Sequence, residues 1–417
     1  MQCLYDFFIQ LFGLGIRLAG CRSVKAKALA QGHKHWKEEL QTFAVQQKAP
    51  VIWFHVASLG EYEQGIQLME SIREHYPSYK ILLTFFSPSG YEHCKNNSLA
   101  DKVCYLPLDT KGNAREFLKI LRPKVAIFIK YEFWYNFLKE LALEHIPVYF
   151  VAVRFRPKQY FFRFYGSWFV GHLKTVSGFF VQNEISKQCL YKVGINQVWV
   201  SGDTRFDRVL KIKESKEDFP WIASFAQQKR LIIAGSSWPN DEKLLKLYLE
   251  KQGLGCRLIL VPHEIHLSRL DAVLKEFQSL GAVLYSSVKK GEIDASHFER
   301  VKVLIIDEVG ILSKIYRYAD IAYIGGGFGK GIHNVLEAAV YGIPVLFGPN
   351  YGKFGEALDL ISCGGAFSVA NEEELEYRLN SLKDPSLWKI SSAKAEEYVS
   401  SHDGAVEIVL KQMSSEL

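Results

Sequence analysis

The sequence lacks a long hydrophobic run, a paired-cysteine motif and any internal repeat. Its seven cysteines are an odd number spread from Cys3 to Cys363, and none of them forms a CxxC. A disulfide framework or a zinc site is therefore not predicted, and reduced thiols that pack as small apolar residues are expected. No low-complexity tract breaks the chain, so a folded protein is expected along its length.

Strong charge is also missing. The 417 residues carry a net charge of +6, with 48% hydrophobic and 23% charged residues. That length favours two domains, and the composition is globular. The charge is too mild to indicate nucleic acid, whereas an anionic substrate and an anionic membrane surface fit it equally well.

The amino terminus is apolar without being long enough to span a bilayer. Its uncharged run extends from Phe7 to Ile16, short of the ~20 residues a spanning helix needs. The basic residues follow the run, which is unlike a secretory signal; they are Arg22, Lys25, Lys27, Lys34 and Lys37. We predict that residues 1–38 form an anchor in or on the inner leaflet, with the body in the cytoplasm. The alternative is a helix packed on the protein's own core.

Short β-rich runs alternate with helical patterns in two sets, which predicts an α/β fold with two doubly wound, Rossmann-like domains. The first set is VIWFHVAS, KILLTFF, KVAIFIK, PVYFVAV and GFFVQ; the second is LIIAGSS, RLILVPH, VKVLIID, DIAYIGGG and IPVLFG. A charged segment between them, residues 204–220, is interpreted as the linker. The expected domains are therefore residues 39–203 and 221–417.

A glycine-rich segment, residues 323–350, predicts an anion site. Gly325, Gly326 and Gly327 end a strand and a helix is expected to start near Asn334, so backbone amides and a helix amino terminus would converge. The segment matches neither a P-loop nor a dinucleotide fingerprint. A glycine-rich loop without a ligand is the alternative.

Asn334 and Glu337 should share one helix face, where the carboxylate could accept hydrogen bonds from ribose hydroxyls. They could equally be a capping pair. His263, after RLILV, and the segment Asp307–Gly310, after VKVLII, are expected at the same sheet edge.

In the first half, FHVASLGE places Glu61 just after a buried strand. A carboxylate there could be catalytic, or it could merely favour the dipole of the following helix. Residues 151–170 mix Arg154, Arg156, Lys158 and Arg163 with aromatic side chains that include Phe164 and Tyr165. This mixture suits lipid phosphates, or else an amphipathic helix that covers the sheet.

These motifs together resemble the Kdo transferases, which move 3-deoxy-D-manno-octulosonic acid (Kdo) from CMP-Kdo to a lipid A precursor. The matching segments follow the family order over nearly the whole chain. They are Ser58–Glu61, Glu132–Asn136, Arg205–Asp207 after Gly202, Pro262-His263, Gly310-Ile311-Leu312, Gly325-Gly326, His333–Glu337 and Ile343–Pro349. Ile311, Ile332, Val335 and Arg205 depart from the usual family residues, which suggests a divergent branch.

The resemblance implies a GT-B fold, with the two domains facing a central cleft, and an inverting, metal-independent glycosyltransferase without a cofactor. Glu61 would be the base. The CMP of the donor would be bound by Pro262, His263, Gly310, Ile311, Leu312, Gly325, Gly326, Asn334, Val335, Leu336 and Glu337, with Arg205 as a basic residue on the donor side. The acceptor would meet Ser58, Gly60 and Glu132, together with Arg154, Arg156 and Arg163 of the basic aromatic segment.

The implied partners are CMP-Kdo, a lipid A precursor and the lipid surface of the inner membrane at its cytoplasmic face, and no nucleic acid. One alternative is another GT-B enzyme that uses a UDP-sugar, such as an N-acetylglucosaminyl transferase or a 2-epimerase. The second alternative is a non-catalytic nucleotide-binding or membrane-associated module.

Overall fold

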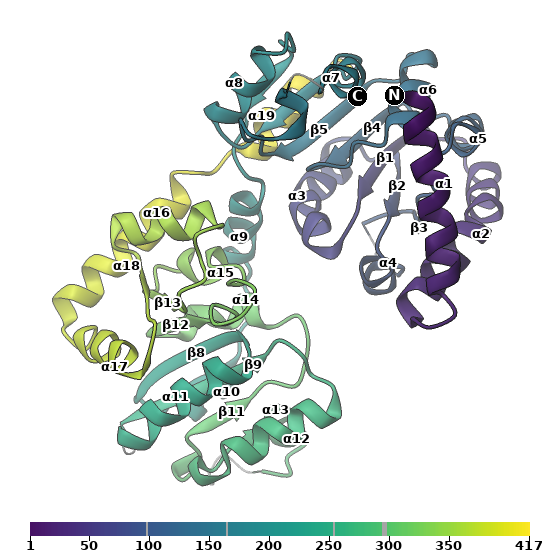
Figure 1. Ribbon diagram of the computed structural model, residues 1–417. Coiled ribbons are helices and arrows are strands. Elements are labelled where there is room, and N and C mark those ends of the chain that lie inside the picture. The colour runs from purple at the N-terminus through teal and green to yellow at the C-terminus, as the bar shows by residue number, and fades with distance from the viewer. Residues whose placement is uncertain (97–98, 164–165, 253–254, 294–297) are drawn as a thin grey trace. The chain divides into compact units, whose positions relative to one another are not determined.

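The computed structural model describes residues 1–96, 99–163, 166–252, 255–293 and 298–417. The chain divides into two compact units. The first comprises Met1–Arg208 together with Gly404–Leu417, and the second comprises Val209–Asp403. Each unit is built around a seven-stranded sheet (Figure 1). All strand pairs in both sheets are parallel, so the predicted α/β class is confirmed.

The sheet of the first unit has the strand order β3-β2-β1-β4-β5-β6-β7. Both faces of a doubly wound sheet are covered, and accordingly all six residues of β1 are buried. Strand order reverses between β1 and β4, which is where open α/β sheets bind ligands. The strands are β1 Val51–Val56, β2 Lys80–Phe85, β3 Lys102–Tyr105, β4 Val125–Ile129, β5 Val148–Val153, β6 Gly178–Val181 and β7 Val198–Val200.

Helices of the first unit follow apolar spacing. In α5, the buried residues Ala114, Phe117, Leu118 and Leu121 form one stripe, and the Thr110 side chain caps the first turn. The helices are α1 Gln2–Ala19, α2 Val24–Gln46, α3 Leu59–His75, α4 Pro88–Cys94, α5 Lys111–Leu121, α6 Tyr135–Leu143, α7 Ser167–Leu173, α8 Glu184–Tyr191 and α19 Ala405–Met413, with a short 3-10 turn at Tyr160–Phe162.

The amino-terminal helix α1 has one packed face and one exposed apolar face. Ile9, Gly13 and Ile16 are buried against the unit. The opposite face exposes Leu4, Phe7, Phe8, Leu11, Phe12, Leu14 and Leu18, each between 47% and 65%. A membrane-crossing helix is not found among the described residues, since none is both long and apolar enough. The expected boundary at residue 38 falls inside α2, so the basic segment is part of a helix of the unit.

The sheet of the second unit has the order β10-β11-β9-β8-β12-β13-β14. Its order reverses between β8 and β12, so the loops after these two strands flank the position where a ligand is expected. The strands are β8 Arg230–Ser237, β9 Cys256–Pro262, β10 Val283–Leu284, β11 Val303–Ile305, β12 Ile321–Ile324, β13 Val345–Phe347 and β14 Ala366–Ser368.

The helices of the second unit connect these strands and continue after the last of them. They are α10 Pro220–Ala226, α11 Pro239–Lys251, α12 Leu267–Glu276, α13 Tyr285–Lys289, α14 Leu312–Ile315, α15 Leu336–Ala339, α16 Gly355–Cys363, α17 Glu372–Ser381 and α18 Pro385–Ser400.

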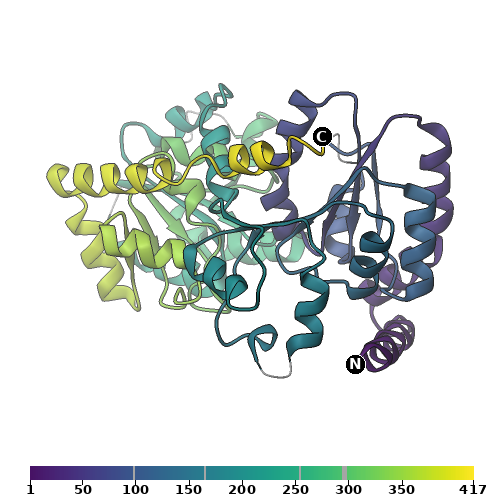
Figure 2. The same ribbon diagram turned by 90° about the horizontal axis from the view of Figure 1, so that it is seen from above.

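One of the expected domain limits needs correction. The boundary between the two units, after Arg208, falls inside the segment interpreted as the linker, residues 204–220, which contains the helix α9, Arg205–Lys213. The last helix, α19, does not belong to the second unit: Val406, Val409 and Met413 are buried in a core cluster of the first. Figure 2 shows α19, in yellow, beside α3. Apolar burial on the first sheet decides where this helix packs, whatever its position in the chain.

Candidate active site

Glu61 lies at the switch point of the first sheet. It is in the first turn of α3, immediately after β1, and the Ala57 backbone N–H donates to Glu61 Oε2 at 2.5 Å. This bond fixes the carboxylate over the helix start. Gly60 is exposed, and a Cβ added there would have no described atom within 4 Å, so the backbone beside Glu61 is open to a ligand. Ser58 is the N-cap residue of α3.

The environment raises the pKa of Glu61 to about 7. Burial is the largest cause and the charge of Glu132 is the second, while the amides of Ala57 and Ser58 and the charge of Lys130 act in the opposite direction. A carboxyl group with a pKa near 7 is suited to accept a proton at neutral pH. Glu61 therefore lies at the helix start, as predicted, and its pKa makes it a candidate base.

Glu132 follows β4, on the other side of the switch point, and is held by two aromatic residues. Trp134 Nε1 donates to Glu132 Oε2 at 3.0 Å, and His55 Nε2 lies 3.3 Å from the same oxygen. His55 is fully buried on β1, and its Nδ1 lies 2.8 Å from Thr84 Oγ1. The structure thus brings together Ser58, Gly60, Glu61 and Glu132 at one sheet edge, as predicted.

Asn136, the last residue of the motif Glu132–Asn136, serves the amino-terminal helix. Its Nδ2 donates to Asp6 Oδ1 at 2.9 Å and to the Asp109 backbone oxygen at 2.6 Å. Its Oδ1 accepts a hydrogen bond from Gln2 Nε2 at 3.0 Å. Tyr5 Oη donates to Asp109 Oδ2 at 2.5 Å. This part of the motif therefore joins α1 to the loop that carries Glu132.

The three arginines predicted for the acceptor lie in two places. Arg154 and Arg156 follow β5. The charges of both lower the pKa of Tyr131, the residue before Glu132, against the larger effect of burial, which raises it. Arg163 instead lines a separate cavity of about 280 Å³ together with Lys174. The segment 151–170 is not the single amphipathic helix considered as an alternative, because it comprises the end of β5, a 3-10 turn and the start of α7. Phe164 and Tyr165 lie outside the described residues.

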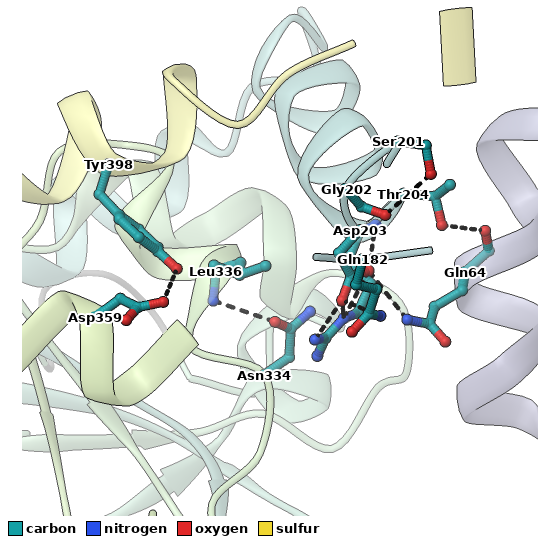
Figure 3. A network of polar contacts seen from close by, with 11 residues as sticks. Gln64, Gln182, Ser201, Gly202, Asp203, Thr204, Asn334, Leu336, Asp359 and Tyr398 are labelled. Carbon is teal, nitrogen blue, oxygen red and sulfur yellow. Dashed lines mark hydrogen bonds and ion pairs between the residues drawn. The ribbon is translucent and has the colours of Figure 1, made fainter. Parts of the chain in front are cut away.

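Arg205, predicted on the donor side, belongs to the first unit and pairs with a buried acid. Its Nη2 lies 2.7 Å from Asp203 Oδ2. Gln64 and Gln182 donate to the two oxygens of the same carboxylate at 3.0 and 2.8 Å (Figure 3). Burial raises the pKa of Asp203, but Arg205 and these donors outweigh it and lower the pKa overall. Arg205 is therefore held rigidly at the start of α9.

In the second unit, two backbone N–H groups of the glycine loop after β12 donate hydrogen bonds within the chain. Gly325 N–H donates to the Gly235 oxygen and Gly326 N–H donates to Asp241 Oδ2, both at 2.9 Å. A Cβ on Gly325 would lie 2.3 Å from the Ser236 oxygen, and Gly326 has a φ of 91°. These glycines are required by close backbone approach and by a left-handed turn, and their amides are engaged with the chain itself.

Asn334 and Glu337 contact each other, as the sequence predicted. Asn334 Nδ2 donates to Glu337 Oε1 at 3.0 Å. Asn334 Oδ1 accepts a hydrogen bond from Leu336 N–H at 3.1 Å (Figure 3). The helix α15 begins at Leu336, with Val335 as its N-cap, so it starts two residues later than expected. The capping interpretation is correct in part, because Asn334 orders the helix start from outside the helix.

His263 lies in a stack of three rings beside the switch point of the second sheet, between β8 and β12. Its ring centroid is 5.0 Å from that of Trp238, after β8, and 4.3 Å from that of His333. Trp238 Nε1 donates to His333 Nε2 at 3.2 Å. Burial, with a smaller effect of His263, lowers the pKa of His333 to about 4, so His333 is neutral at pH 7. Pro262, which ends β9, sets the ring of His263 at the sheet edge.

The segment Gly310-Ile311-Leu312 reaches the same edge from the loop after β11. Gly310 has a φ of 92°, and Ile311 is the N-cap of α14. A Cβ on Gly235 of β8 would lie 1.9 Å from Tyr316 Oη and 2.9 Å from Leu312 Cδ2. Because glycine at 235 allows this approach, Leu312 and Tyr316 lie directly against the switch point.

Several site residues were not predicted from the sequence: His55, Lys130, Trp238 and Asp241. Three of them share a signal that was available, because Lys130 ends one predicted strand, Trp238 directly follows another and His55 lies within a third. Asp241 lies in the first turn of α11 and reaches Gly326 only through the fold. Among the described residues, no group of three or more His, Cys, Asp or Glu side chains could hold a metal ion.

Two doubly wound parallel sheets, each with polar side chains at its switch point, define the GT-B class of glycosyltransferase folds. A putative UDP-N-acetylglucosamine 2-epimerase from Listeria monocytogenes has a TM-score of 0.58 at 14% identity, over 87% of this chain and 95% of its own. The UDP-GlcNAc 2-epimerase from Neisseria meningitidis bound to UDP-GlcNAc has a TM-score of 0.55 at 14% identity, over 88% of this chain and 100% of its own. These likenesses concern the fold alone.

The sequence comparisons point to one family. The family model "3-Deoxy-D-manno-octulosonic-acid transferase (kdotransferase)" matches residues 34–208. The 3-deoxy-D-manno-octulosonic acid transferase of Rickettsia felis is 28% identical over 345 residues, which are 80% of this chain and 72% of the relative. That of Chlamydia trachomatis serovar D is 28% identical over 318 residues, 73% of this chain and 71% of the relative. These matches support the resemblance to the Kdo transferase family and a glycosyltransferase activity.

Proposed function

We propose that this enzyme transfers Kdo from CMP-Kdo to a sugar hydroxyl of a lipid A precursor, with inversion at the anomeric carbon. The observation that carries the proposal is Glu61, a half-buried carboxyl group with a pKa of about 7 at the switch point of the first sheet. An inverting transfer needs one base to take the proton of the attacking hydroxyl. In this proposal Glu61 Oε1 receives that proton, while Oε2 stays bonded to the Ala57 amide.

The second unit would bind the CMP part of the donor. Trp238, which is 37% exposed and stacks on His263, offers a ring face beside the switch point, and base stacking on such a ring is favourable without a specific edge contact. Glu337, held by Asn334, can accept hydrogen bonds from ribose hydroxyls. When the bond to the anomeric carbon breaks, CMP leaves as a phosphate, whose charge must be stabilised by groups other than the Gly325 and Gly326 amides, which already donate within the chain.

Transfer is proposed to need neither a metal nor a cofactor, since CMP-Kdo carries a single phosphate. The assay is to incubate the purified protein with CMP-Kdo and a tetraacylated lipid A precursor, with and without a chelator, and to weigh the lipid products. One or more Kdo additions at an equal rate in both samples are expected. A product formed only without the chelator would contradict the metal-independent part.

Calorimetry separates this reaction from that of a UDP-sugar enzyme of the same fold. CMP is expected to bind to the protein and UDP to bind at least tenfold more weakly. Binding of UDP in preference to CMP would favour a UDP-sugar donor, and binding of neither nucleotide by a protein that also yields no product would favour a non-catalytic module.

The inner-membrane lipid surface at the cytoplasmic face is proposed as the place of reaction, because the acceptor carries acyl chains. The exposed apolar face of α1 supports this proposal, since a run of large apolar side chains on an amphipathic helix binds at the bilayer interface. A cavity of about 650 Å³ between α1 and α2, on the packed side of α1, adds Arg17, Lys27 and Lys34. Cationic side chains near an apolar helix face attract anionic lipid head groups.

Vesicle sedimentation tests the membrane surface. Replacement of Leu11 and Leu18 by Ser is expected to reduce binding to anionic vesicles at least tenfold. The matched control replaces Leu143 and Ile185, which are 59% and 61% exposed elsewhere in the first unit, by Ser. Equal loss in both double variants would contradict a role for α1.

A further inference from the structure

His55 is a fully buried histidine that the proposed reaction does not use. It lies on β1, with Thr84 of β2 on one side of its ring and Glu132 and Trp134, after β4, on the other. Buried polar atoms in proteins are almost always hydrogen-bonded, so the protons of this group can be counted from its partners.

A hydrogen on Nδ1 matches the polar contacts on that side of the ring. Thr84 Oγ1 accepts a hydrogen bond from Trp53 Nε1 at 2.8 Å, and its own hydroxyl can donate to the Phe54 oxygen at 3.2 Å. In that arrangement Thr84 Oγ1, 2.8 Å from His55 Nδ1, is an acceptor toward the ring. The Thr84 backbone oxygen, 3.2 Å from the same nitrogen, can only accept. Every donor and acceptor is matched if Nδ1 is protonated.

The Nε2 side needs one more hydrogen than Trp134 supplies. Trp134 Nε1 is 3.0 Å from His55 Nε2 and 3.0 Å from Glu132 Oε2, and these two atoms are 3.3 Å apart. A neutral imidazole beside an ionised carboxylate would direct two lone pairs at each other across that distance. A hydrogen on Nε2, or on Oε2, turns the contact into a hydrogen bond.

We propose that His55 is a positioning residue that holds one proton jointly with Glu132, so that the pair is electrically neutral beside Glu61 and Glu61 keeps the negative charge of a base. The inference rests on the proposed function, because it concerns the base of that reaction. The shared proton also fixes the Glu132 carboxyl between Trp134 and His55.

The charges around Glu61 explain why the pair matters. Glu132 acts against ionisation of Glu61, and Lys130, at the end of β4, acts in its favour. Two ionised carboxylates close together cannot both hold their charge easily. A proton on the His55–Glu132 pair offsets part of that repulsion, while burial, the largest cause, keeps the pKa of Glu61 raised. Without His55, Glu132 would face Glu61 as an uncompensated anion.

Magnetic resonance of the full-length protein tests the shared proton without any assay of transfer. Nitrogen-15 in the His55 ring and carbon-13 in the Glu132 carboxyl, assigned by their loss in His55→Gln and Glu132→Gln, report each protonation state. At pH 7.5 we expect a protonated Nδ1 and one further proton, seen on Nε2 or on the carboxyl group. A neutral imidazole beside an ionised Glu132 would overturn the proposal.

The rate of Kdo transfer as a function of pH tests the consequence for Glu61. The acid limb is the part of the profile in which kcat falls as the pH is lowered. In His55→Gln this limb is expected to move to higher pH by about one unit, and in Glu132→Gln it is expected to move to lower pH. The double variant should behave like Glu132→Gln, because His55 has no carboxylate to compensate there. Equal acid limbs in the wild type and in His55→Gln, or shifts that add in the double variant, would overturn the proposal.

A destabilised variant separates this role from a purely structural one. Ile52→Ala, on the same buried strand, is expected to lower stability and leave the acid limb where it is in the wild type. If His55→Gln does not fold, the resonance experiment on the wild type and Glu132→Gln still decides. A wild type that transfers no Kdo at any pH would refute the proposed function, while the protonation states would still answer the inference on their own.

Discussion

Glu61 combines a helix-start hydrogen bond with a position at the sheet edge, and the two roles favour different protonation states. The Ala57 amide favours the carboxylate, whereas burial and Glu132 favour the neutral acid, and the raised pKa of about 7 shows that the second group prevails. At neutral pH a substantial fraction of the enzyme then carries an ionised base.

Glu61→Gln is expected to lower kcat for Kdo transfer by ~10²–10⁴-fold, the usual contribution of a general base. Glutamine can still accept the Ala57 hydrogen bond, so the substitution removes the proton acceptor with little change in geometry. The wild-type rate should fall as the pH falls below about 7, as Glu61 becomes protonated. A steady-state assay from pH 5.5 to 9 checks this, and an unimpaired variant would remove Glu61 from the role of base.

The same residue predicts a pH dependence of stability. Because the pKa of Glu61 is raised from 4.5 to about 7, the native state holds this proton more tightly than the unfolded chain does. The resulting stability is present below pH 4.5 and is lost as the pH rises through about 7. Urea unfolding at pH 5 and pH 8 should therefore show a larger loss in the wild type than in Glu61→Gln. An identical loss in both proteins would argue against a raised pKa.

Predictions from the sequence placed best the residues that lie shortly after a strand. Glu61 and Glu132 lie at the switch point of the first sheet, and His263 follows β9 at the same edge of the second sheet, because the carboxyl ends of parallel strands share one edge. The use of Gly326 N–H could not be predicted, since its acceptor Asp241 is 85 residues away and reaches it only through packing. Local sequence shows which loop lies at an edge, but it does not show which of its amides remain available.

At the scale of elements, the strands that the sequence missed are short or lack an apolar run. β7 and β10 have three and two residues, and β3 begins with the charged Lys102. The strands that it found are continuous hydrophobic runs, as expected for parallel strands buried on both faces. The two sheets were predictable for that reason, whereas β3, β7 and β10, three of their four edge strands, were not.

The attachment of α1 depends on a few polar contacts in addition to its three buried residues. Burial raises the pKa of Asp109 to about 6, and its carboxylate is held by Tyr5 and by the amides of Asn136 and Phe137. Tyr5→Phe leaves one acceptor of a buried carboxylate unmatched, which should cost about 1.5–3 kcal/mol. Hydrogen exchange is expected to show faster opening of α1.

The control for this prediction is Tyr79→Phe, which removes a hydroxyl that donates to the Leu417 oxygen at the other chain end. It should speed exchange in α19 and leave α1 unchanged. If α1 opens equally fast in both variants, the Tyr5–Asp109 bond does not hold the helix. Vesicle binding by Tyr5→Phe would then show whether a loosened α1 still reaches a lipid surface.

At the scale of the whole molecule, the two units do not follow each other simply along the chain, because the first unit contains both the first and the last residues. The sequence placed all residues after the linker in one domain, because no composition change marks residue 404. The structure returns the chain to the first unit, where Asp207 Oδ1 accepts a hydrogen bond from Val406 N–H at 2.9 Å. The last fourteen residues, Gly404–Leu417, thus complete the unit that carries Glu61.

Met413→Ala should therefore destabilise the first unit although it lies four residues from the carboxyl terminus. Met413 is fully buried, and truncating a buried methionine to alanine typically costs 2–5 kcal/mol. Hydrogen exchange should rise in β1 and β4 and stay constant in β8 and β12. Leu249→Ala, equally buried in the second unit, is the matched control and should give the reverse pattern. Loss of protection in β8 and β12 of Met413→Ala would mean that α19 supports the second unit, and the division of the chain would have to be redrawn.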